Sequence, residues 1–332
     1  MHHGVVRAAD GELVSTGRRL IVVGASGLIG RALLAAAAAE RRPAVGTYFA
    51  NPAPGLVPFD LARHDFAAAF PDLGPGDAVI LLSARADPNW VFANPLESHE
   101  LNVDGSLRAI AHTRARGARL VFVSTEIVFD GETGGYAETD RPNPSTLYAQ
   151  QKVAVEEAIQ SGGGSWAIIR TGWTVGWQKD ARCPILLSYK TLMTAGARMA
   201  EDNVFTLTDV RDTAAALLQL ADRHDNDLWH IASAPPVSRT DLADWVIAAS
   251  RFGSRMGYER VRFAEIPYPE PRPERSWIVN HKAVQNLHLT FAEPWRTVAR
   301  KVGLIDSWFE ASQRLHGAPP PVVPEPPRGP PR

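Results

Sequence analysis

The sequence predicts an α/β fold in which a doubly wound parallel sheet is joined to a smaller C-terminal lobe. Short apolar runs alternate with helical patterns over the first half of the chain, as parallel strands joined by right-handed crossovers require. A glycine-rich turn at residues 24–30 follows the first run and opens an alanine-rich helix. The alternation ends after Thr171, where a stretch containing proline and tryptophan begins.

The individual elements follow from periodicity and length. The β-branched and apolar runs predict strands at residues 20–23, 44–48, 56–59, 78–82, 120–124 and 166–170. The longer amphipathic patterns predict helices near residues 28–40, 95–116 and 146–160. Later helical patterns near residues 213–223, 239–252 and 294–309 predict the smaller lobe.

Composition changes mark the expected domain boundaries. Residues 1–18 are polar and aperiodic, so we expect a disordered leader. Residues 19–170 form mainly the sheet domain, and residues 171–315 mainly the second lobe, with some segments returning to the sheet domain. Residues 316–332 are mostly proline and are expected to be a disordered tail, because such a segment cannot bury a core.

Charge and cysteine content narrow the possible partners. The 35 basic and 36 acidic residues give a formal net charge of −1, so no basic face for nucleic acid is expected and the partner should be a small molecule. Cys183 is the single cysteine, which excludes an intramolecular disulfide and a cysteine metal cluster. The histidines show no metal-ligand spacing. Without a membrane span or signal peptide, the protein is expected to be cytoplasmic.

The glycine-rich turn predicts a Rossmann dinucleotide-binding site. Gly24 permits the tight turn, Gly27 lets backbone amides approach a pyrophosphate, and Gly30 lets the helix pack close to the sheet. The strand before and the helix after the turn disfavour the alternative of an ordinary glycine-rich loop. The expected cofactor contacts in the turn are Gly24, Ser26, Gly27, Leu28, Ile29 and Gly30.

The choice between NAD and NADP depends on the end of the second strand. Residues 47–51 supply neither the acidic residue typical of NAD sites nor an arginine for the 2′-phosphate of NADP. The missing acid favours NADP, and NAD remains open.

Tyr148 and Lys152 form a Y-x-x-x-K element on a predicted helix, where a spacing of four residues places both side chains on one face. Ser124 and Thr125 end the fifth strand, and strand ends at this edge of the sheet face the cofactor crevice. A carbonyl that receives a hydride needs a proton donor. Tyr148 is the expected general acid, its pKa lowered by the Lys152 ammonium and the charged nicotinamide, and Thr125 is expected to hydrogen-bond the substrate oxygen.

The G-x-x-G-x-x-G spacing together with Thr125, Tyr148 and Lys152 resembles the extended short-chain dehydrogenases/reductases. That resemblance implies an NAD(P)-dependent oxidoreductase in which Tyr148 and Lys152 also contact the cofactor, Lys152 through the nicotinamide ribose. It implies an adenine contact at Asp60, for which a plain strand-ending aspartate is the alternative. The further cofactor contacts implied are Leu61, Ser83 and Asn102.

A closer resemblance is to the dTDP-4-dehydrorhamnose reductase group. Residues 124–131 are similar to its S-T-D-Y-V-F-D-G segment, residues 170–173 to its R-T-S-W block, and residues 272–276 to its R-P-x-x-S block. The resemblance spans roughly residues 19–308. It implies a ketoreductase of a nucleotide-linked 4-keto-deoxysugar, and a homodimer is an open alternative because dimers are frequent in the family.

Several departures from that group leave the substrate open. Glu126 stands where the group has aspartate, and Ile127 stands where related sugar dehydratases have a catalytic glutamate, which disfavours dehydration. Residues 203–209 lack the glycine and proline expected beside the substrate, and Val279 replaces an acidic residue. Two alternatives therefore remain: a reductase of a carbonyl compound that is not a sugar, and a non-catalytic NADP-binding protein similar to the regulatory beta subunit of methionine adenosyltransferase.

Other side chains after the sixth strand suit a sugar-nucleotide. Trp173 and Trp177 have aromatic faces that could line a sugar or base, and core packing is the alternative. Four cations could bind a diphosphate, with a solvated helix face as the alternative for each. These cations are Lys179, Arg182, Lys190 and Arg198.

Overall fold

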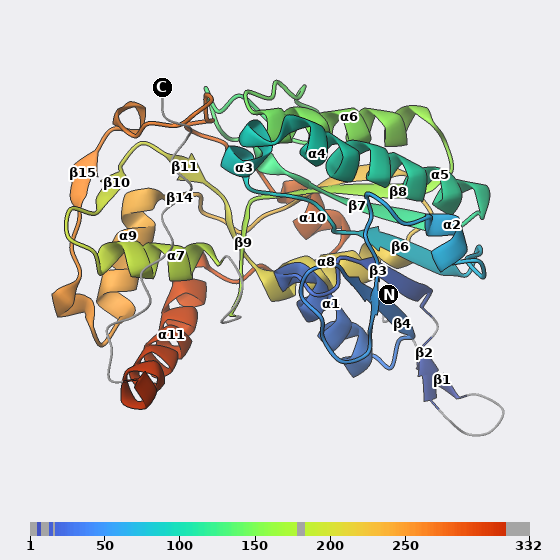
Figure 1. Ribbon diagram of the computed structural model, residues 1–332, viewed down its shortest axis with the longest axis horizontal. Helices are drawn as coiled ribbons and strands as arrows, with labels where there is room; N and C mark the ends of the chain where they lie inside the picture. Colours follow the sequence, from blue (N-terminus) through green and yellow to red (C-terminus); the bar gives the residue numbers. More distant parts are fainter. Residues whose placement is uncertain (1–4, 8–12, 16, 178–182, 317–332) are drawn as a thin grey trace.

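A sheet domain and a smaller lobe lie beside one another in the structure, which is a computed structural model (Figure 1). It describes residues 5–7, 13–15, 17–177 and 183–316, with side chains from residue 17 to 177 and from 183 to 312. The predicted α/β class and the doubly wound parallel sheet are confirmed.

Seven parallel strands form the central sheet in the order β13-β8-β7-β6-β3-β4-β5. They are β3 (Arg19–Val23), β4 (Ala44–Tyr48), β5 (Leu56–Pro58), β6 (Asp77–Leu81), β7 (Arg119–Thr125), β8 (Ser165–Thr171) and β13 (Asp227–Ile231). The first six match the predicted strands. Chain order reverses between β3 and β6, and such a switch point opens a ligand crevice at the carboxyl ends of the strands.

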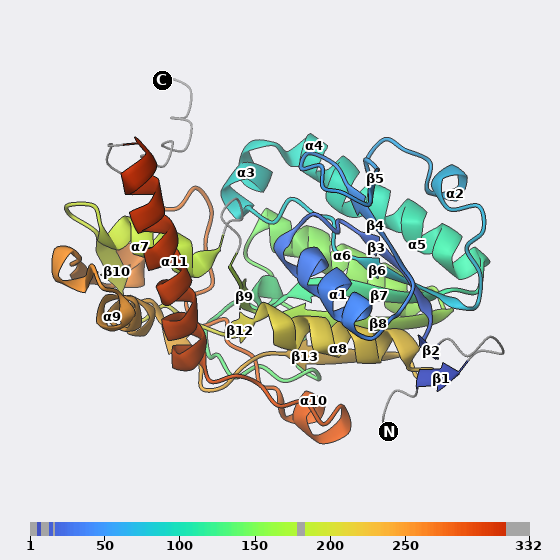
Figure 2. The same ribbon diagram turned by 90° about the horizontal axis from the view of Figure 1, so that it is seen from below.

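Helices cover both faces of the sheet (Figure 2). One face packs against α1 (Leu28–Ala39), α8 (Val210–Asp222) and α10 (His281–Asn286). The other packs against α2 (Phe66–Ala69), α5 (Ser106–Ala115) and α6 (Leu147–Ser161). α3 (Pro88–Ala93) and α4 (Pro95–His99) precede α5, and the 3-10 turn η2 (Glu126–Val128) follows β7.

The helix predicted at residues 95–116 is interrupted by one π-helical segment, η1 (Glu100–Gly105), between α4 and α5. Gly105 allows η1 to lie close to the loop that follows β5. A Cβ on Gly105 would lie 2.4 Å from the carbonyl oxygen of Leu61. Only glycine therefore fits at this contact, which fixes η1 against the loop after β5.

The smaller lobe has its own apolar core, formed mainly by α7 (Pro184–Leu192), α9 (Arg239–Ala249) and α11 (Pro294–His316). Its short strands are β9 (Trp173–Val175), β10 (Arg198–Ala200), β11 (Val204–Phe205), β12 (Leu207–Asp209), β14 (Val237–Ser238) and β15 (Glu259–Val261). The 3-10 turns η3 (Gly253–Arg255) and η4 (Phe263–Glu265) complete it. These short strands were not predicted from the sequence.

Segments after residue 171 return to the sheet domain. α8 packs on α1, and β13 pairs with β8 as an edge strand of the sheet. The functional division at residue 171 stays a prediction.

In the leader, β1 (Val5–Arg7) and β2 (Leu13–Ser15) pair antiparallel. The other residues of the leader up to residue 16 and the tail from residue 317 lie outside the described residues. No helix among those described is long and apolar enough to span a membrane.

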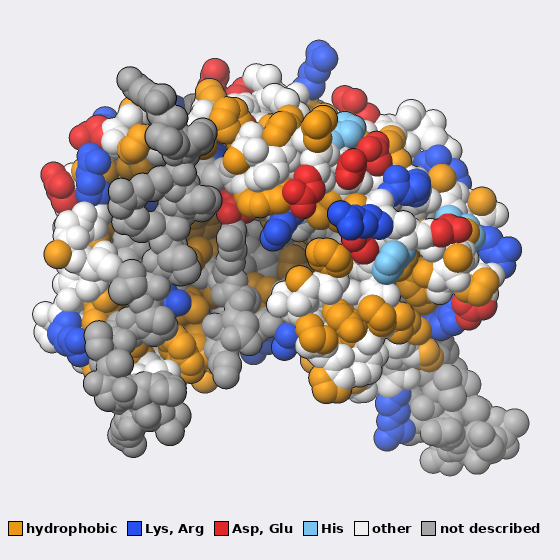
Figure 3. Space-filling view, viewed as in Figure 1, with side chains coloured by type: hydrophobic (Ala, Val, Ile, Leu, Met, Phe, Trp, Pro, Cys, Tyr) orange, Lys and Arg blue, Asp and Glu red, His pale blue; other side chains and the backbone are white. Residues whose placement is uncertain are grey.

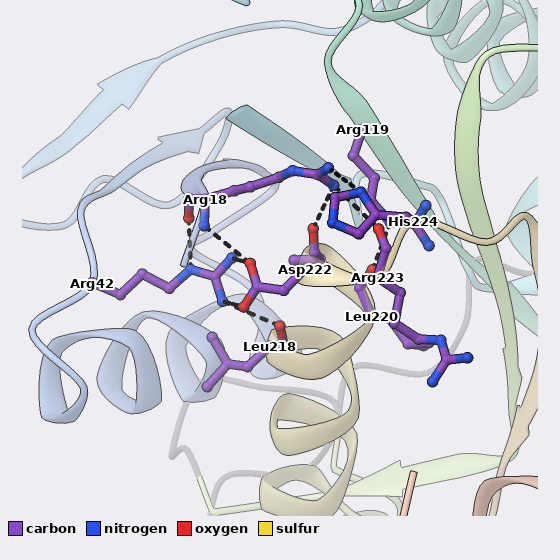
Figure 4. A network of polar contacts seen from close by, with 9 residues as sticks. Arg18, Arg42, Arg119, Leu218, Leu220, Asp222, Arg223 and His224 are labelled. Carbon is purple, nitrogen blue, oxygen red and sulfur yellow. Dashed lines mark hydrogen bonds and ion pairs between the residues drawn. The ribbon is translucent and has the colours of Figure 1, made fainter. Parts of the chain in front are cut away.

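Arginines close the end of the sheet opposite the crevice, around the C-terminus of α8 (Figure 4). Arg42, with a side chain 1% exposed, pairs with Asp222 at 2.7 Å. Arg42, Arg119 and Arg18 also donate to main-chain carbonyls of the last turns of α8 at 3.1, 2.7 and 3.1 Å. These bonds satisfy carbonyls that a helix end leaves unpaired and fix α8 to the sheet.

Candidate active site

The glycine-rich turn between β3 and α1 has the backbone geometry that its sequence predicts. Gly24 has a φ of +91°, and a Cβ there would lie 2.9 Å from the backbone nitrogen of Ser83. A Cβ on Gly30 would lie 2.5 Å from the Cα of Ala25. Glycine is therefore required at both positions by the turn itself and by the close packing of α1 on β3.

Gly27 is different, because packing against the residues that the structure describes does not explain it. Its φ of −73° and ψ of 173° suit any residue, and a Cβ would meet only the Gly24 oxygen, at the ordinary distance of 3.4 Å. Gly27 is also the N-cap of α1, without a side-chain cap hydrogen bond and without an acidic residue in the first turn. A bare backbone in front of uncapped amides fits a dinucleotide pyrophosphate.

The other expected cofactor residues in loops lie at the same edge of the sheet. Ser83 follows β6 and contacts Gly24. The Gly24 amide also donates to the Thr47 hydroxyl at the end of β4, at 3.0 Å. Asp60 and Leu61 follow β5: the Asp60 carboxylate accepts from the Ala62 amide at 2.9 Å, and Leu61 is buried. Asp60 therefore shapes its own turn, and its adenine contact stays a prediction.

Asn102, on η1, ties the loop after β6 to the catalytic helix. Its side chain accepts from the Arg85 amide at 2.8 Å and donates to the Arg85 carbonyl at 3.2 Å. It also donates to Gln151 at 2.8 Å, and Gln151 donates to the Ser98 hydroxyl at 2.8 Å. Sequence reasoning missed Gln151 and Ser98, although Gln151 lies between Tyr148 and Lys152 in the Y-x-x-x-K element.

The expected catalytic residues converge from β7 and α6. α6 begins with Thr146 as its N-cap, whose hydroxyl accepts from the Ala149 amide at 3.2 Å, so Tyr148 and Lys152 lie in its first two turns. The Lys152 ammonium donates to the Val123 carbonyl at 2.9 Å, two residues before Thr125 on β7. The Thr125 hydroxyl accepts from the Ile127 amide at 3.4 Å, which leaves its own hydrogen for another acceptor.

Burial governs the protonation of this pair. Tyr148 and Lys152 are both buried, and the ammonium lies 5.9 Å from the centre of the phenol ring. Burial lowers the pKa of Lys152 to about 8, and the Glu156 carboxylate opposes that shift. Burial raises the pKa of Tyr148 in the chain alone. The expected lowering of this pKa needs two positive charges near the phenol. The Lys152 ammonium donates to the Val123 carbonyl of β7, and the other charge, on the nicotinamide, belongs to the cofactor.

Glu126, directly after Thr125, joins the end of β7 to the smaller lobe. Its carboxyl group is buried and accepts from the Thr206 amide at 3.0 Å and from the Ser276 hydroxyl at 3.1 Å. Burial raises its pKa to about 8. A Cβ on Gly172 would lie 2.6 Å from this carboxyl and 2.4 Å from the Thr206 carbonyl oxygen, so the glycine leaves the space they need.

The tryptophans and the lysine expected to suit a sugar-nucleotide make aromatic contacts within the smaller lobe. Trp173 stacks on Phe205 at 4.3 Å between ring centres, and Trp177 packs edge-on against Trp308. Lys190 lies over the Trp308 ring at 5.9 Å. These contacts give Trp177 and Lys190 packing roles in the smaller lobe.

Arg198 pairs with Glu265 and Glu259 at 3.5 and 4.0 Å, so its charge is already partnered within the smaller lobe. Lys179 and Arg182 lie outside the described residues.

The surface is hollowed between the smaller lobe and the sheet domain (Figure 3). The part of the chain with a described structure contains no group of three His, Cys, Asp or Glu residues placed to hold a metal ion.

Comparisons with known proteins identify relatives of this chain. The model of the RmlD substrate binding domain family matches residues 18–303. A dTDP-4-dehydrorhamnose reductase of Mycobacterium tuberculosis is 32% identical over 270 residues, 78% of this chain and 84% of that protein. Methionine adenosyltransferase 2 subunit beta of Bos taurus is 28% identical over 227 residues, 66% of this chain and 67% of that protein.

Among solved structures, the dTDP-4-dehydrorhamnose reductase of Bacillus anthracis in complex with NADP has a TM-score of 0.74 and 17% identity, covering 87% of this chain and 100% of that one. At this identity the likeness concerns the fold.

Proposed function

Because the chain belongs to the RmlD substrate binding domain family, we propose that it is an NADP-dependent ketoreductase of a nucleotide-linked 4-keto-deoxysugar. The chain is an oxidoreductase of the extended short-chain dehydrogenase/reductase type. One observation supports the specific proposal: Lys152 on α6 donates to Val123 on β7, two residues before Thr125, and the glycine-rich turn contains Gly27, which no contact among the described residues explains.

The proposed reaction assigns one role to each of the three residues. The Tyr148 hydroxyl donates its proton to the substrate carbonyl oxygen as that oxygen gains charge. Lys152 stabilises the resulting phenolate electrostatically, and its ammonium is oriented by its bond to the Val123 carbonyl. Thr125 donates a hydrogen bond to the same substrate oxygen. A bound NADPH supplies the hydride.

NADP is the proposed cofactor, with NAD as the second choice. The glycine-rich turn and the uncapped start of α1 would hold the pyrophosphate. A related structure was solved with NADP, and residues 47–51 contain no acidic side chain for the ribose hydroxyls of NAD. Asp60, Leu61, Ser83 and Asn102 are the proposed contacts outside the turn.

A non-catalytic, NADP-binding regulatory subunit is the second candidate, because the chain is also similar to methionine adenosyltransferase 2 subunit beta. The complete Thr125, Tyr148 and Lys152 set favours the enzyme. A reductase of a carbonyl compound that is not a sugar remains the third candidate, since residues 203–209 depart from the reductase group. A homodimer stays a prediction, which sedimentation would check.

Purified protein incubated with NADPH or NADH and dTDP-4-dehydrorhamnose tests the proposal. We expect NADPH oxidation and a reduced sugar product detected by mass spectrometry. Cofactor binding without turnover of this sugar or of simple ketones would favour the regulatory subunit. Turnover of simple ketones alone would favour the non-sugar reductase.

A further inference from the structure

Arg239 is the first residue of α9 in the smaller lobe. It follows β14, which pairs with β11 (Figure 1). Its guanidinium lies over the Trp173 ring at 4.5 Å, and Trp173 stacks on Phe205. Trp173 lies two residues after Thr171, which is the partner of Thr125 across β7 and β8. Arg239 therefore contacts the segment that directly follows β8, the strand that pairs with the Thr125 end of β7.

Hydrogen bonds fix the Arg239 side chain in this position. Its Nε donates to the Asn203 side-chain oxygen at 2.6 Å, and its backbone amide donates to the Asn203 carbonyl at 3.2 Å. Asn203 is buried, and its own amide donates to the Glu274 carbonyl at 2.8 Å. Residues 203–209 are the segment that departs from the reductase group, so here that segment orients an arginine.

The charge of Arg239 has no acidic counterpart among the residues that the structure describes. The partly buried guanidinium makes no salt bridge there, whereas Arg42 and Arg170 each pair with a carboxylate. Its two Nη nitrogens make no hydrogen bond within the same residues and are not among the fully buried unpaired atoms, so each keeps some contact with solvent. Burial lowers the pKa of Arg239.

A fixed arginine with two unpaired Nη groups is suited to an anion. Its planar fork matches the geometry of phosphate oxygens, and less conformational freedom is lost on binding when the side chain is already held. We propose that Arg239 binds the diphosphate of the nucleotide-linked substrate and is a specificity-determining residue. This inference rests on the proposed function, because it takes a nucleotide-sugar as the substrate.

Binding of dTDP to the full-length protein in the presence of NADP tests the inference without turnover. We expect Arg239→Met to weaken dTDP binding by at least about tenfold in isothermal titration calorimetry. Arg239→Lys should lose less, because a lysine keeps the charge but lacks the fork. The matched control is Arg296→Met, since Arg296 also stacks on a tryptophan, Trp295, but is paired with Glu293 and exposed on α11. The control and the NADP affinity of all variants should remain unchanged.

The same variants separate this inference from the proposed function. Arg239-dependent dTDP binding by a protein that reduces no sugar would support the inference and reject the ketoreductase. Sugar reduction with the same KM in the parent and Arg239→Met would support the ketoreductase and overturn the inference. Equal dTDP affinity in the parent, Arg239→Met and Arg239→Lys, or no dTDP binding at all, would also overturn it. If Arg239→Met fails to fold, the comparison of Arg239→Lys with the parent decides.

Discussion

Gly27→Ala should separate cofactor binding from folding. The backbone of Gly27 suits alanine, and the new Cβ would meet only the Gly24 oxygen, at 3.4 Å. The free energy of unfolding should therefore change by less than about 1 kcal/mol, with a small gain because alanine restricts the unfolded chain. The methyl group would stand where a pyrophosphate has to approach the amides of α1. NADPH affinity should fall at least about tenfold, or ~1.4 kcal/mol.

Gly30→Ala is the matched comparison in the same turn. Its Cβ would lie 2.5 Å from the Cα of Ala25 and 2.7 Å from the Gly24 oxygen, both backbone atoms that cannot move cheaply. This variant should lose about 1–3 kcal/mol of stability through overpacking. Urea unfolding and a fluorescence titration with NADPH measure both quantities. A Gly27→Ala protein that binds NADPH as tightly as the parent would refute the reasoning.

Two further predictions concern buried charges. The folded state holds the Glu126 proton up to about pH 8, while the unfolded chain loses it near the ordinary carboxyl pKa. Its stabilising contribution is thus complete at acidic pH and is lost as the pH rises to about 8. Between about pH 5 and 8, the unfolding midpoint of Glu126→Gln should fall less steeply with pH than that of the parent. An equal fall in both proteins would reject the raised pKa of Glu126. Asp222→Ala should cost about 3 kcal/mol in urea unfolding, because it leaves the buried Arg42 without its carboxylate; parental stability would show that the pair contributes little.

The sequence predicted the elements that carry a strong periodic pattern or a distinctive turn. Six strands of the sheet follow from apolar runs, helices α1, α5, α6 and α8 follow from the longer periodic patterns, and the glycine spacing identified the turn between β3 and α1. β13 was not predicted as a strand, because Asp227 and His230 interrupt its apolar run. Its pairing with β8 depends on a contact between residues far apart in the chain, which local patterns do not encode.

The parts of the site that were missed depend on contacts between the two lobes. Nothing in the sequence near Glu126 indicates that Thr206 and Ser276 bind its carboxyl group. Arg239 is an ordinary first residue of a helix until Asn203 and Trp173 are placed against it. Burial raises the pKa of Tyr148 in the chain alone, and the lowered pKa expected beside Lys152 and a bound nicotinamide stays a prediction.

The most direct test of the proposed mechanism is the rate of NADPH oxidation by Tyr148→Phe with dTDP-4-dehydrorhamnose, followed by absorbance beside the parent protein. Phenylalanine keeps the ring but removes the proton donor, so we expect turnover to fall by about 10²–10⁴ while NADPH affinity is retained. A Tyr148→Phe protein that reduces the sugar at the parental rate would contradict the assignment of Tyr148 as the general acid.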